Sequence, residues 1–336
     1  MAARGMYRRY AMMRWGIVGA GGIARRFAAS LAHVEGAELV AASRRTREAA
    51  EAFLAEVPAA SDARAYGSHD ELIADEGVDA VYVALPHSLH AAWSIRALET
   101  GKAVLSEKPA AISVEETRAV SAAARAADVL YMEALKTRFV PLHERIMAAL
   151  PRLGRLQRVE ATLCNDAMAE LTGSGTYHLA DGPGAGALLD CGIYCAGWIE
   201  ELVSGPWEVT DSVARLHGSA DVYSRTAFQA GSVTAVLECA FDEGKPRQLT
   251  VLGERGRLVV EELHRPQRGV LELTGSAPEV LAAPYTVDDF YGELMHFRDL
   301  YRAGLKESPL MPWAASIRCA ELLDLARARI FENRAG

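Results

Sequence analysis

The pattern of apolar and polar positions changes about a third of the way along the chain. Before about residue 137, short runs that are apolar throughout alternate with longer segments in which apolar residues recur every three or four positions. The short runs predict strands buried on both faces, and the longer segments predict amphipathic helices. This alternation is typical of a parallel sheet with helices on both sides, the doubly wound Rossmann arrangement. The predicted strands cover 14–18, 38–42, 80–85, 103–106 and 129–134, and the predicted helices cover 23–33, 46–56, 70–75, 89–100 and 113–127.

After residue 137 the apolar positions follow a different period. Several segments alternate strictly between polar and apolar residues, which predicts strands with two unlike faces. Two further segments flank the turn Gly253-Glu254-Arg255-Gly256 and predict a hairpin. The predicted strands are 156–163, 209–216, 224–230, 232–241, 247–252 and 257–263, with helices over 140–150, 287–302 and 313–333. We therefore expect a C-terminal α+β domain with a large, mostly antiparallel open sheet. One face should pack on helices, and the other should pair with a second subunit in a homodimer or homotetramer.

Chain length agrees with this division. At roughly 150 residues per domain, 336 residues predict two domains. We expect a disordered extension over 1–13, a dinucleotide-binding Rossmann domain over 14–136, and a substrate-binding and oligomerisation domain over 137–336.

A glycine cluster follows the first predicted strand. The spacing Gly19-x-Gly21-x-x-Ala24 is that of the dinucleotide-binding fingerprint. The first glycine allows a tight turn, the second lets the backbone approach a pyrophosphate, and the next helix offers free N–H groups at its positive end. A glycine-rich turn can also be simply a turn, but its place between a strand and a helix favours dinucleotide binding. The expected binding residues here are Gly19, Ala20, Gly21, Gly22, Ile23 and Ala24.

The end of the second predicted strand bears on which dinucleotide is bound. An acidic residue there would hold the ribose 2′-hydroxyl of NAD. This chain has Ser43-Arg44-Arg45-Thr46 instead. A guanidinium can pair with a 2′-phosphate and a serine hydroxyl can donate to it, so Ser43 and Arg44 favour NADP(H) over NAD(H). The alternative is that the arginines are surface charges at a strand end.

Composition and charge narrow the classes of partner. Half of the residues are hydrophobic, 24% are charged and the formal charge is −8, which is ordinary for a globular protein and argues against nucleic acid as a partner. No run of eighteen apolar residues exists, so we expect no membrane span. Arg8-Arg9 could belong to an export signal, but the first core strand begins almost at once, so we expect a cytoplasmic protein.

The cysteines do not indicate a metal site. They are odd in number and form no CxxC pair, so we expect buried structural thiols and no metal. The five are Cys164, Cys191, Cys195, Cys239 and Cys319.

A second glycine-rich segment, Gly182-Pro183-Gly184-Ala185-Gly186, leads into a predicted helix that reaches about residue 203. Asp190 and Tyr194 are four positions apart on it and should face the same side. A polar pair on an otherwise apolar helix is expensive to bury. The pair is either part of a functional site or a satisfied core aspartate beside a half-buried tyrosine.

Four signals now stand in order along the chain. They are Gly19-x-Gly21-x-x-Ala24, Leu85-Pro86-His87-x-x-His90, Glu107-Lys108-Pro109 and Asp190-x-Gly192-x-Tyr194. No single motif is specific, but the ordered set resembles the Gfo/Idh/MocA oxidoreductase family over about residues 14–333.

The resemblance implies roles for several of these residues. Glu107 and Lys108 match the family's Glu-Lys-Pro, whose lysine lies beside the reacting carbon, and Asp190 matches a substrate-pocket aspartate. Leu85, Pro86 and His90 match the loop on the nicotinamide side of the cofactor. The Lys-Pro peptide is often cis in the family, which the sequence of this chain cannot decide.

Tyr194 stands where inositol dehydrogenases of the family carry histidine. Tyrosine at this position is similar to aldose (xylose) 1-dehydrogenases, dimeric dihydrodiol dehydrogenases and glucose–fructose oxidoreductase. Those relatives mostly use NADP, in agreement with Ser43 and Arg44. Residues 1–13 are too short for the cofactor-gripping arm of glucose–fructose oxidoreductase itself.

The chemistry also follows from the residue types. Removing hydride from a carbinol carbon requires a base for the hydroxyl proton, and the reverse reaction requires its conjugate acid. A phenol has a pKa of about 10, and a nearby ammonium lowers that value and stabilises a developing alkoxide. We therefore expect Tyr194 to act as acid/base, Lys108 as its electrostatic partner and Asp190 as the residue that orients a substrate hydroxyl.

Three functions remain open at this point. The leading one is an NADP-dependent oxidoreductase that acts on an aldose or a similar cyclic polyol. The second is a trans-dihydrodiol dehydrogenase, which an apolar pocket floor would favour over a polar one. The third is a non-catalytic NADP(H)-binding regulatory protein, against which the presence of both Lys108 and Tyr194 counts.

Overall fold

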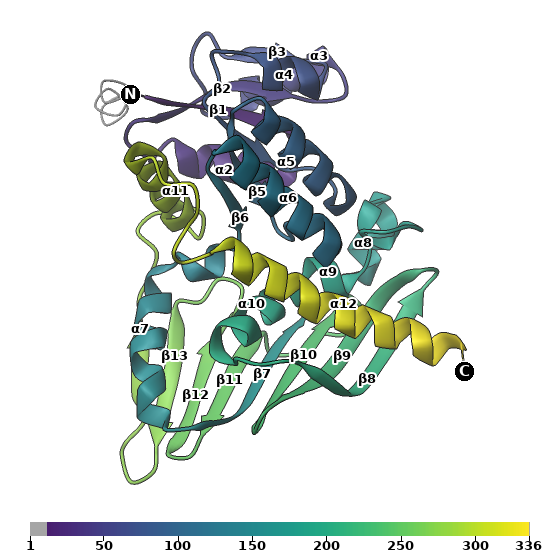
Figure 1. Ribbon diagram of the computed structural model, residues 1–336, viewed down its shortest axis with the longest axis vertical. Helices are drawn as coiled ribbons and strands as arrows, with labels where there is room; N and C mark the ends of the chain where they lie inside the picture. The colour runs from purple at the N-terminus through teal and green to yellow at the C-terminus, as the bar shows by residue number, and fades with distance from the viewer. Residues whose placement is uncertain (1–11, 336) are drawn as a thin grey trace. The chain divides into compact units, whose positions relative to one another are not determined.

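Six parallel strands form the first sheet, in the order β3-β2-β1-β4-β5-β6 (Figure 1). Their bounds are β1 Met13–Val18, β2 Ala37–Ser43, β3 Arg64–Tyr66, β4 Ala80–Val83, β5 Ala103–Glu107 and β6 Tyr131–Ala134. This computed structural model describes residues 12–335. The central strands are buried along their whole length, which explains why they read as continuous apolar runs.

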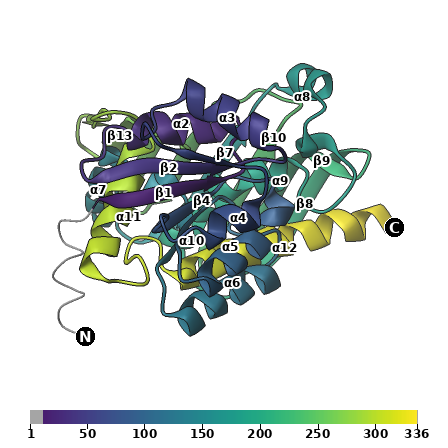
Figure 2. The same cartoon turned by 90° about the horizontal axis from the view of Figure 1, so that it is seen from above.

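Helices cover both faces of this sheet. They are α2 Gly22–Leu31, α3 Arg47–Glu56, α4 His69–Ala74, α5 His90–Glu99 and α6 Val114–Ala127. Figure 2 shows α2 and α3 on one face and α4, α5 and α6 on the other. An aromatic cluster lies beneath α2, where the rings of Phe27 and Tyr82 stack with centroids 3.8 Å apart. These side chains form the core between the sheet and α2.

A late segment of the chain belongs to the same compact unit. Residues 286–313 group with 12–111 and 115–134, whereas 112–114, 135–285 and 314–335 form the second unit. Helix α11 (Tyr291–Ala303) packs against α2. The contact is fixed by an ion pair between Arg26 and Asp289 and by a 2.9 Å hydrogen bond from Ser30 to Asp288.

The second unit contains an eight-stranded sheet in the order β14-β13-β12-β11-β7-β10-β9-β8. Its strands are β7 Leu156–Cys164, β8 Glu208–His217, β9 Ala220–Ala230, β10 Val233–Ala240, β11 Gln248–Gly253, β12 Gly256–Glu261, β13 Arg268–Leu273 and β14 Glu279–Ala282. Only the β7–β10 pairing is parallel, and the other pairings are antiparallel.

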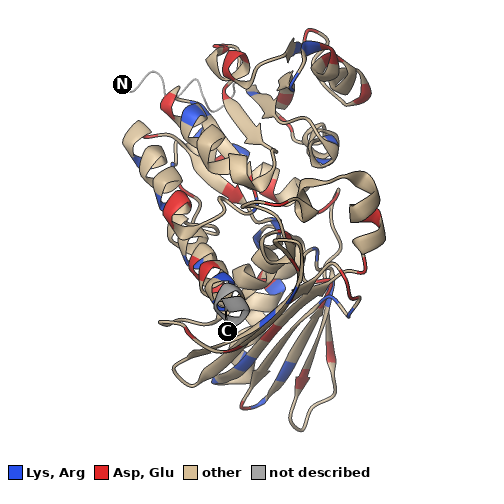
Figure 3. Ribbon diagram, turned by 90° about the vertical axis from the view of Figure 1, so that its right-hand side faces the viewer, with Lys and Arg blue, Asp and Glu red and all other residues tan. Residues whose placement is uncertain are grey.

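The two faces of this sheet differ in character. One face carries helices, namely α7 Pro141–Ala149, α9 Ala187–Asp190 and α10 Gly192–Leu202. On the opposite face, charged side chains of neighbouring strands pair with each other, and Figure 3 shows blue and red positions along the strands of this sheet. Arg225 on β9, for example, pairs with Asp211 on β8 at 3.3 Å. The remaining helices are α8 Met168–Ser174 and α12 Trp313–Ala335.

The fold class predicted from the sequence is confirmed, with local differences. The first strand begins at Met13, and residues 1–11 of the expected disordered extension lie outside the described residues. The helix predicted to run to about 203 is wrong in one respect: it is interrupted at Cys191 between α9 and α10. Strands β3, β13 and β14 were not predicted. Between residues 12 and 335, every helix is too short or too polar to cross a membrane.

Candidate active site

The carboxyl ends of the parallel strands place several predicted residues at one edge of the first sheet. Strand β1 lies between β2 and β4, so the strand order runs outward from β1 to β3 in one direction and then from β4 to β6 in the other. Such a switch point opens a crevice at the carboxyl edge, where ligands of α/β proteins bind. Gly19 follows β1, Ser43 ends β2, Leu85 follows β4 and Glu107 ends β5.

The glycine turn after β1 has no side chains that would keep a ligand away from its backbone. Gly19 has a φ of +90°, and a Cβ on it would lie 2.6 Å from the Ala84 carbonyl oxygen, so a larger residue would not fit. At Gly21 and Gly22, by contrast, a Cβ would meet nothing within 4 Å. The N-terminus of α2 therefore faces open space, and its first turn carries no acidic residue. This arrangement can accept a phosphate group.

The two residues proposed to distinguish the dinucleotides have different surroundings. Ser43 is fully buried, and its hydroxyl lies 2.8 Å from His69 Nδ1 and 3.3 Å from the Ile17 carbonyl oxygen. Arg44 is half-buried, with its backbone N–H bonded to Tyr66 at 3.1 Å. The hydroxyl of Ser43 is thus engaged within the fold, and the guanidinium of Arg44 is the better candidate for contact with a ligand.

His90 ties two of the predicted loops together. Its ring is buried, with Nδ1 2.7 Å from the Pro109 carbonyl oxygen and Nε2 2.7 Å from the Leu85 carbonyl oxygen. A neutral imidazole carries one N–H and donates to one carbonyl at a time. Burial lowers the pKa of His90, which favours the neutral ring. His90 therefore positions the segments that contain Pro86 and Lys108.

The Glu107-Lys108-Pro109 segment is held by buried hydrogen bonds. The Tyr82 hydroxyl donates to Glu107, and the Lys108 backbone N–H lies 3.2 Å from the other oxygen of that carboxylate. The Lys108–Pro109 peptide is cis. Glu107 is 8% exposed, so its role here is to fix the backbone that presents Lys108.

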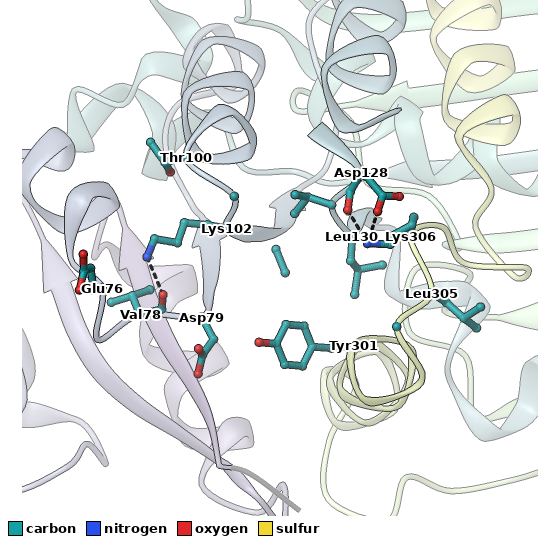
Figure 4. Close-up of a pocket in the computed structure, with 14 residues that line it drawn as sticks. Glu76, Val78, Asp79, Thr100, Lys102, Asp128, Leu130, Tyr301, Leu305 and Lys306 are labelled. Atoms are coloured by element: carbon teal, nitrogen blue, oxygen red, sulfur yellow. Dashed lines mark hydrogen bonds and ion pairs between the residues drawn. The ribbon is translucent and has the colours of Figure 1, made fainter. Parts of the chain in front are cut away.

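A cavity of about 700 Å³ lies at the opposite, amino edge of the same sheet. Its lining residues Asp79, Lys102 and Leu130 immediately precede strands β4, β5 and β6 (Figure 4). The Lys102 ammonium donates to the carbonyl oxygens of Asp75 and Val78, each at 2.7 Å. This lysine is engaged with backbone, and the cavity shares none of the predicted site residues.

In the second unit, Asp190 ends α9 and Tyr194 lies in the first turn of α10. Tyr194 is 8% exposed. Asp190 is half-buried, and its Oδ1 lies 3.9 Å from Nε2 of His178. The structure thus brings together the imidazole of His178 and the carboxylate of Asp190, which lies four positions before Tyr194 in the sequence.

Two residues that the sequence did not single out flank the Tyr194 ring. The Nζ of Lys136 lies 6.0 Å from the ring centroid, and the His264 ring centroid lies 5.9 Å away at an interplanar angle of 65°. Lys136 is 5% exposed. The only signal that could have found it is a lysine inside the apolar stretch that ends the first third of the chain. His264 lies in a loop after β12, and no local pattern connects it to Tyr194.

A half-buried carboxylate from the sheet fixes the start of α9. Asp221 Oδ2 accepts a 2.7 Å hydrogen bond from the Leu188 backbone N–H. A Cβ on Gly186, whose φ is +100°, would lie 2.0 Å from Asp221 Oδ1. Glycine is therefore required at this position, and burial raises the pKa of Asp221 to about 7. Sequence reasoning missed Asp221 because its strand position alone does not indicate the helix it meets.

The five cysteines are all buried and none forms a disulfide. Burial raises the pKa of the Cys164 thiol to about 12. A thiol held in the protonated form is a poor nucleophile and a poor metal ligand.

Comparison with known protein families matches both parts of the chain. Residues 13–135 match the GFO_IDH_MocA family, described as an oxidoreductase family with an NAD-binding Rossmann fold. Residues 146–259 match the GFO/IDH/MocA C-terminal domain.

Individual relatives cover nearly the whole chain. The chain is 32% identical to trans-1,2-dihydrobenzene-1,2-diol dehydrogenase of Mus musculus, over 95% of this chain and 97% of that protein. It is 30% identical to scyllo-inositol 2-dehydrogenase (NADP(+)) IolU of Bacillus subtilis, with the same coverage. Among solved structures, KijD10, a 3-ketoreductase from Actinomadura kijaniata in complex with NADP and TDP-benzene, aligns with a TM-score of 0.83 and 26% identity, covering 94% of this chain and 97% of that one.

Proposed function

This chain belongs to the GFO/IDH/MocA oxidoreductase family, and from that premise we propose that it is an NADP(H)-dependent oxidoreductase of an aldose or a similar cyclic polyol. The observation that carries the proposal is the glycine turn at the switch point, which faces open space at the N-terminus of α2. A dinucleotide diphosphate fits there because the backbone N–H groups and the positive helix end favour an anion.

Arg44 is proposed to select NADP(H). It follows β2 at the same edge of the sheet and replaces the acidic residue that would bind a ribose hydroxyl. NADP(+) in the name of the Bacillus subtilis relative and NADP in the KijD10 complex support this choice. Ser43 is proposed to contribute by holding the strand end, since its hydroxyl is bonded within the fold.

The bound nicotinamide would accept or donate the hydride, and the protein's residues would manage the proton and the charge. Tyr194 is proposed to take the proton from the substrate hydroxyl during oxidation and to return it during reduction. Lys108 is proposed to stabilise the negative charge that develops on the substrate oxygen. Asp190 is proposed to accept a hydrogen bond from a neighbouring substrate hydroxyl and so orient the ring.

The surroundings of Tyr194 favour a polyol as the substrate. Lys136 and His264 lie near the Tyr194 ring, and Asp190, four positions before Tyr194, lies near His178. These hydrogen-bonding groups suit the hydroxyls of a sugar better than an arene. The alternative, a trans-dihydrodiol dehydrogenase, is supported by the 32% identity to the mouse enzyme of that name. A non-catalytic regulatory protein would need neither Lys108 nor Tyr194.

The catalytic assignment is tested with purified protein and a panel of aldoses, inositols and trans-dihydrodiols, by following NADPH absorbance. Tyr194→Phe and Lys108→Ala should each lower kcat by about 10²- to 10⁴-fold. Circular dichroism should verify that both variants are folded. Turnover at the wild-type rate in both folded variants would refute the assignment, and a preference for dihydrodiols would establish the alternative substrate.

The cofactor assignment is tested by titrating NADP and NAD into wild type and Arg44→Ala. A charge-assisted hydrogen bond contributes about 1.5–3 kcal/mol, so the Kd for NADP should rise about tenfold or more while the Kd for NAD changes little. The exposed neighbour Arg45 provides a matched control, since Arg45→Ala should have the smaller effect. An unaltered NADP preference in Arg44→Ala would contradict the assignment.

We also propose that the charged face of the eight-stranded sheet forms a homodimer or homotetramer interface. Sedimentation of the purified protein should detect a particle of two or four chains. A single-chain particle at all concentrations would reject this interface.

A further inference from the structure

Lys136 and Tyr194 lie close to each other within one compact unit of the chain. Lys136 opens the short 3₁₀ helix η2 (Lys136–Arg138), and Tyr194 lies on α10. The ammonium nitrogen is 6.0 Å from the ring centroid, and the two residues are 5% and 8% exposed. An ammonium at this distance from a shielded aromatic face is attracted to the ring.

The structure fixes this contact through the neighbours of Lys136. Arg138, two residues onward, forms a buried ion pair with Glu200 of α10 and donates a 3.2 Å hydrogen bond to the Gly197 carbonyl oxygen. A Cβ on Gly197 would lie 2.5 Å from Leu135 Cδ2, so η2 packs closely on the helix. Arg318 holds the other oxygen of Glu200 at 2.7 Å. The turn that carries Lys136 is therefore anchored to the helix that carries Tyr194.

The other titratable groups around the ring differ in what they contribute. Arg265 donates a 2.8 Å hydrogen bond to Nε2 of His264, which requires that nitrogen to be unprotonated and the imidazole to be neutral. Asp190, at the end of α9, has the His178 imidazole 3.9 Å from its carboxylate. Lys136 is a cation that this unit places near the face of the Tyr194 ring.

We propose that Lys136 is a second lysine of the active site, a positioning residue that stabilises the deprotonated phenol of Tyr194 and thereby sets the pH range of the reaction. The inference rests on the proposed role of Tyr194 as acid/base. A phenolate ring is more electron-rich than a phenol ring, so a nearby cation stabilises the deprotonated form more. The ammonium lies 6.0 Å from the centroid of the ring that carries the phenolate. At the effective dielectric of a protein interior, two unit charges separated by roughly this distance or somewhat more shift an ionisation by about one to two pH units.

Two measurements test the proposal, one of them without turnover. The ultraviolet titration of wild type minus that of Tyr194→Phe isolates the ionisation of this phenol in the protein without cofactor. It should occur below the ordinary value of about 10, and in Lys136→Met it should move up by about one unit. The acid limb of the kcat/KM profile should move up by the same amount, and Lys136→Arg should restore most of it.

Lys245→Met is the matched control, because it removes another lysine whose ammonium lies 5.2 Å from a tyrosine ring in the same unit, that of Tyr223. It should leave the Tyr194 titration and the kcat/KM profile in place. A wild-type Tyr194 that titrates at 10 or above overturns the proposal, even if Lys136→Met fails to fold. So does a folded Lys136→Met that loses activity equally at every pH. Full activity in Tyr194→Phe would instead refute the proposed function, while the ultraviolet titration would still decide the role of Lys136.

Discussion

Two tyrosines of the sheet-bearing unit have similar neighbours but are expected to behave differently. Tyr194 lies on α10, on the helix-covered side of the sheet, and Tyr223 lies on β9 and points to the other side. Each ring has a lysine ammonium near its face, at 6.0 Å from Lys136 and 5.2 Å from Lys245. A lysine near a tyrosine is therefore not by itself a sign of acid/base chemistry.

The phenol of Tyr223 and the ammonium of Lys245 are both bonded to carboxylates. The Tyr223 hydroxyl donates a 2.8 Å hydrogen bond to Glu238, and Lys245 is paired with the same carboxylate at 2.7 Å and with Glu243 at 3.1 Å. Burial, together with this hydrogen bond to a carboxylate, raises the pKa of Tyr223 to about 12. The proton of Tyr223 is thus held in place, whereas an acid/base residue must release it near neutral pH.

The largest expected effect separates the two tyrosines by activity. Tyr194→Phe should lower kcat by about 10²- to 10⁴-fold, whereas Tyr223→Phe should leave kcat within about twofold of wild type, since its hydroxyl is committed to Glu238. Both substitutions remove one hydroxyl from a buried ring, so each controls for the structural effect of the other. Steady-state kinetics on the best substrate of the panel measures the contrast. Equal losses in the two variants would remove the distinction between the two regions.

Much of the first unit could be predicted from the sequence because its elements are local. Each of its first five strands is followed by a helix, and the burial of β4, β5 and β6 on both faces produces apolar runs that are easily recognised. Strand β3, with only three half-buried residues, has no such run. The packing of α11 on α2 was also beyond prediction, because it depends on contacts between distant segments, such as Ser30 with Asp288.

The second unit was predicted less completely for the same reason. Its sheet is assembled from pairings that no local pattern specifies, including the parallel β7–β10 pair. The motif residues Asp190 and Tyr194 could be found because they lie close together in the sequence. Lys136, His264 and Asp221 could not, since each reaches the site from a distant element.

A second expected effect concerns the pH dependence of stability and comes from Asp221. This residue lies on β9, as Tyr223 does, but its carboxylate accepts a hydrogen bond from the start of α9. The pairing of β8 with β9 has an irregularity between Asp221 and Tyr223. In a regular strand these two residues would point to the same face, but the irregularity lets Asp221 face α9 while Tyr223 faces the opposite side. Burial raises the pKa of Asp221 from its ordinary 3.8 to about 7. Between these values the folded protein binds more protons than the unfolded chain, so stability falls as pH rises.

Asp221→Asn should abolish this dependence. Urea unfolding measures the free energy of unfolding of both proteins. The value for wild type minus the value for the variant should fall as pH rises from about 4 to about 7 and should stay constant above that range. The total change should be on the order of a few kcal/mol. A difference that is constant across this range would mean that Asp221 is ionised throughout. Asp221 would then be a permanently charged carboxylate, as Glu238 is expected to be, and would not make stability depend on pH.

A smaller effect tests why the Tyr223 proton is held. Burial is the larger cause of its raised pKa, and the hydrogen bond to Glu238 is the second. Glu238→Gln keeps the shape of the side chain but removes its charge, so the ultraviolet transition of Tyr223 should fall from about 12 by roughly one unit. Subtracting the ultraviolet titration of the Glu238→Gln, Tyr223→Phe double variant from that of Glu238→Gln isolates the ionisation of Tyr223. A transition that stays at about 12 would assign the whole shift to burial.

The smallest expected effect is that of Lys245→Met on stability. The Lys245 side chain is 31% exposed, and its pairs with Glu238 and Glu243 are partly screened by water. Exposed ion pairs contribute about 0–1 kcal/mol, so the midpoint of thermal unfolding should fall slightly, and less in high salt. A Lys245→Met variant that displaced the pH profile of kcat/KM as Lys136→Met is expected to do would show that the charged network around Tyr223 is coupled to catalysis. Charges on one face of the sheet would then affect the ionisation of Tyr194 on the other face. The two tyrosines would differ only in how strongly a nearby lysine affects catalysis.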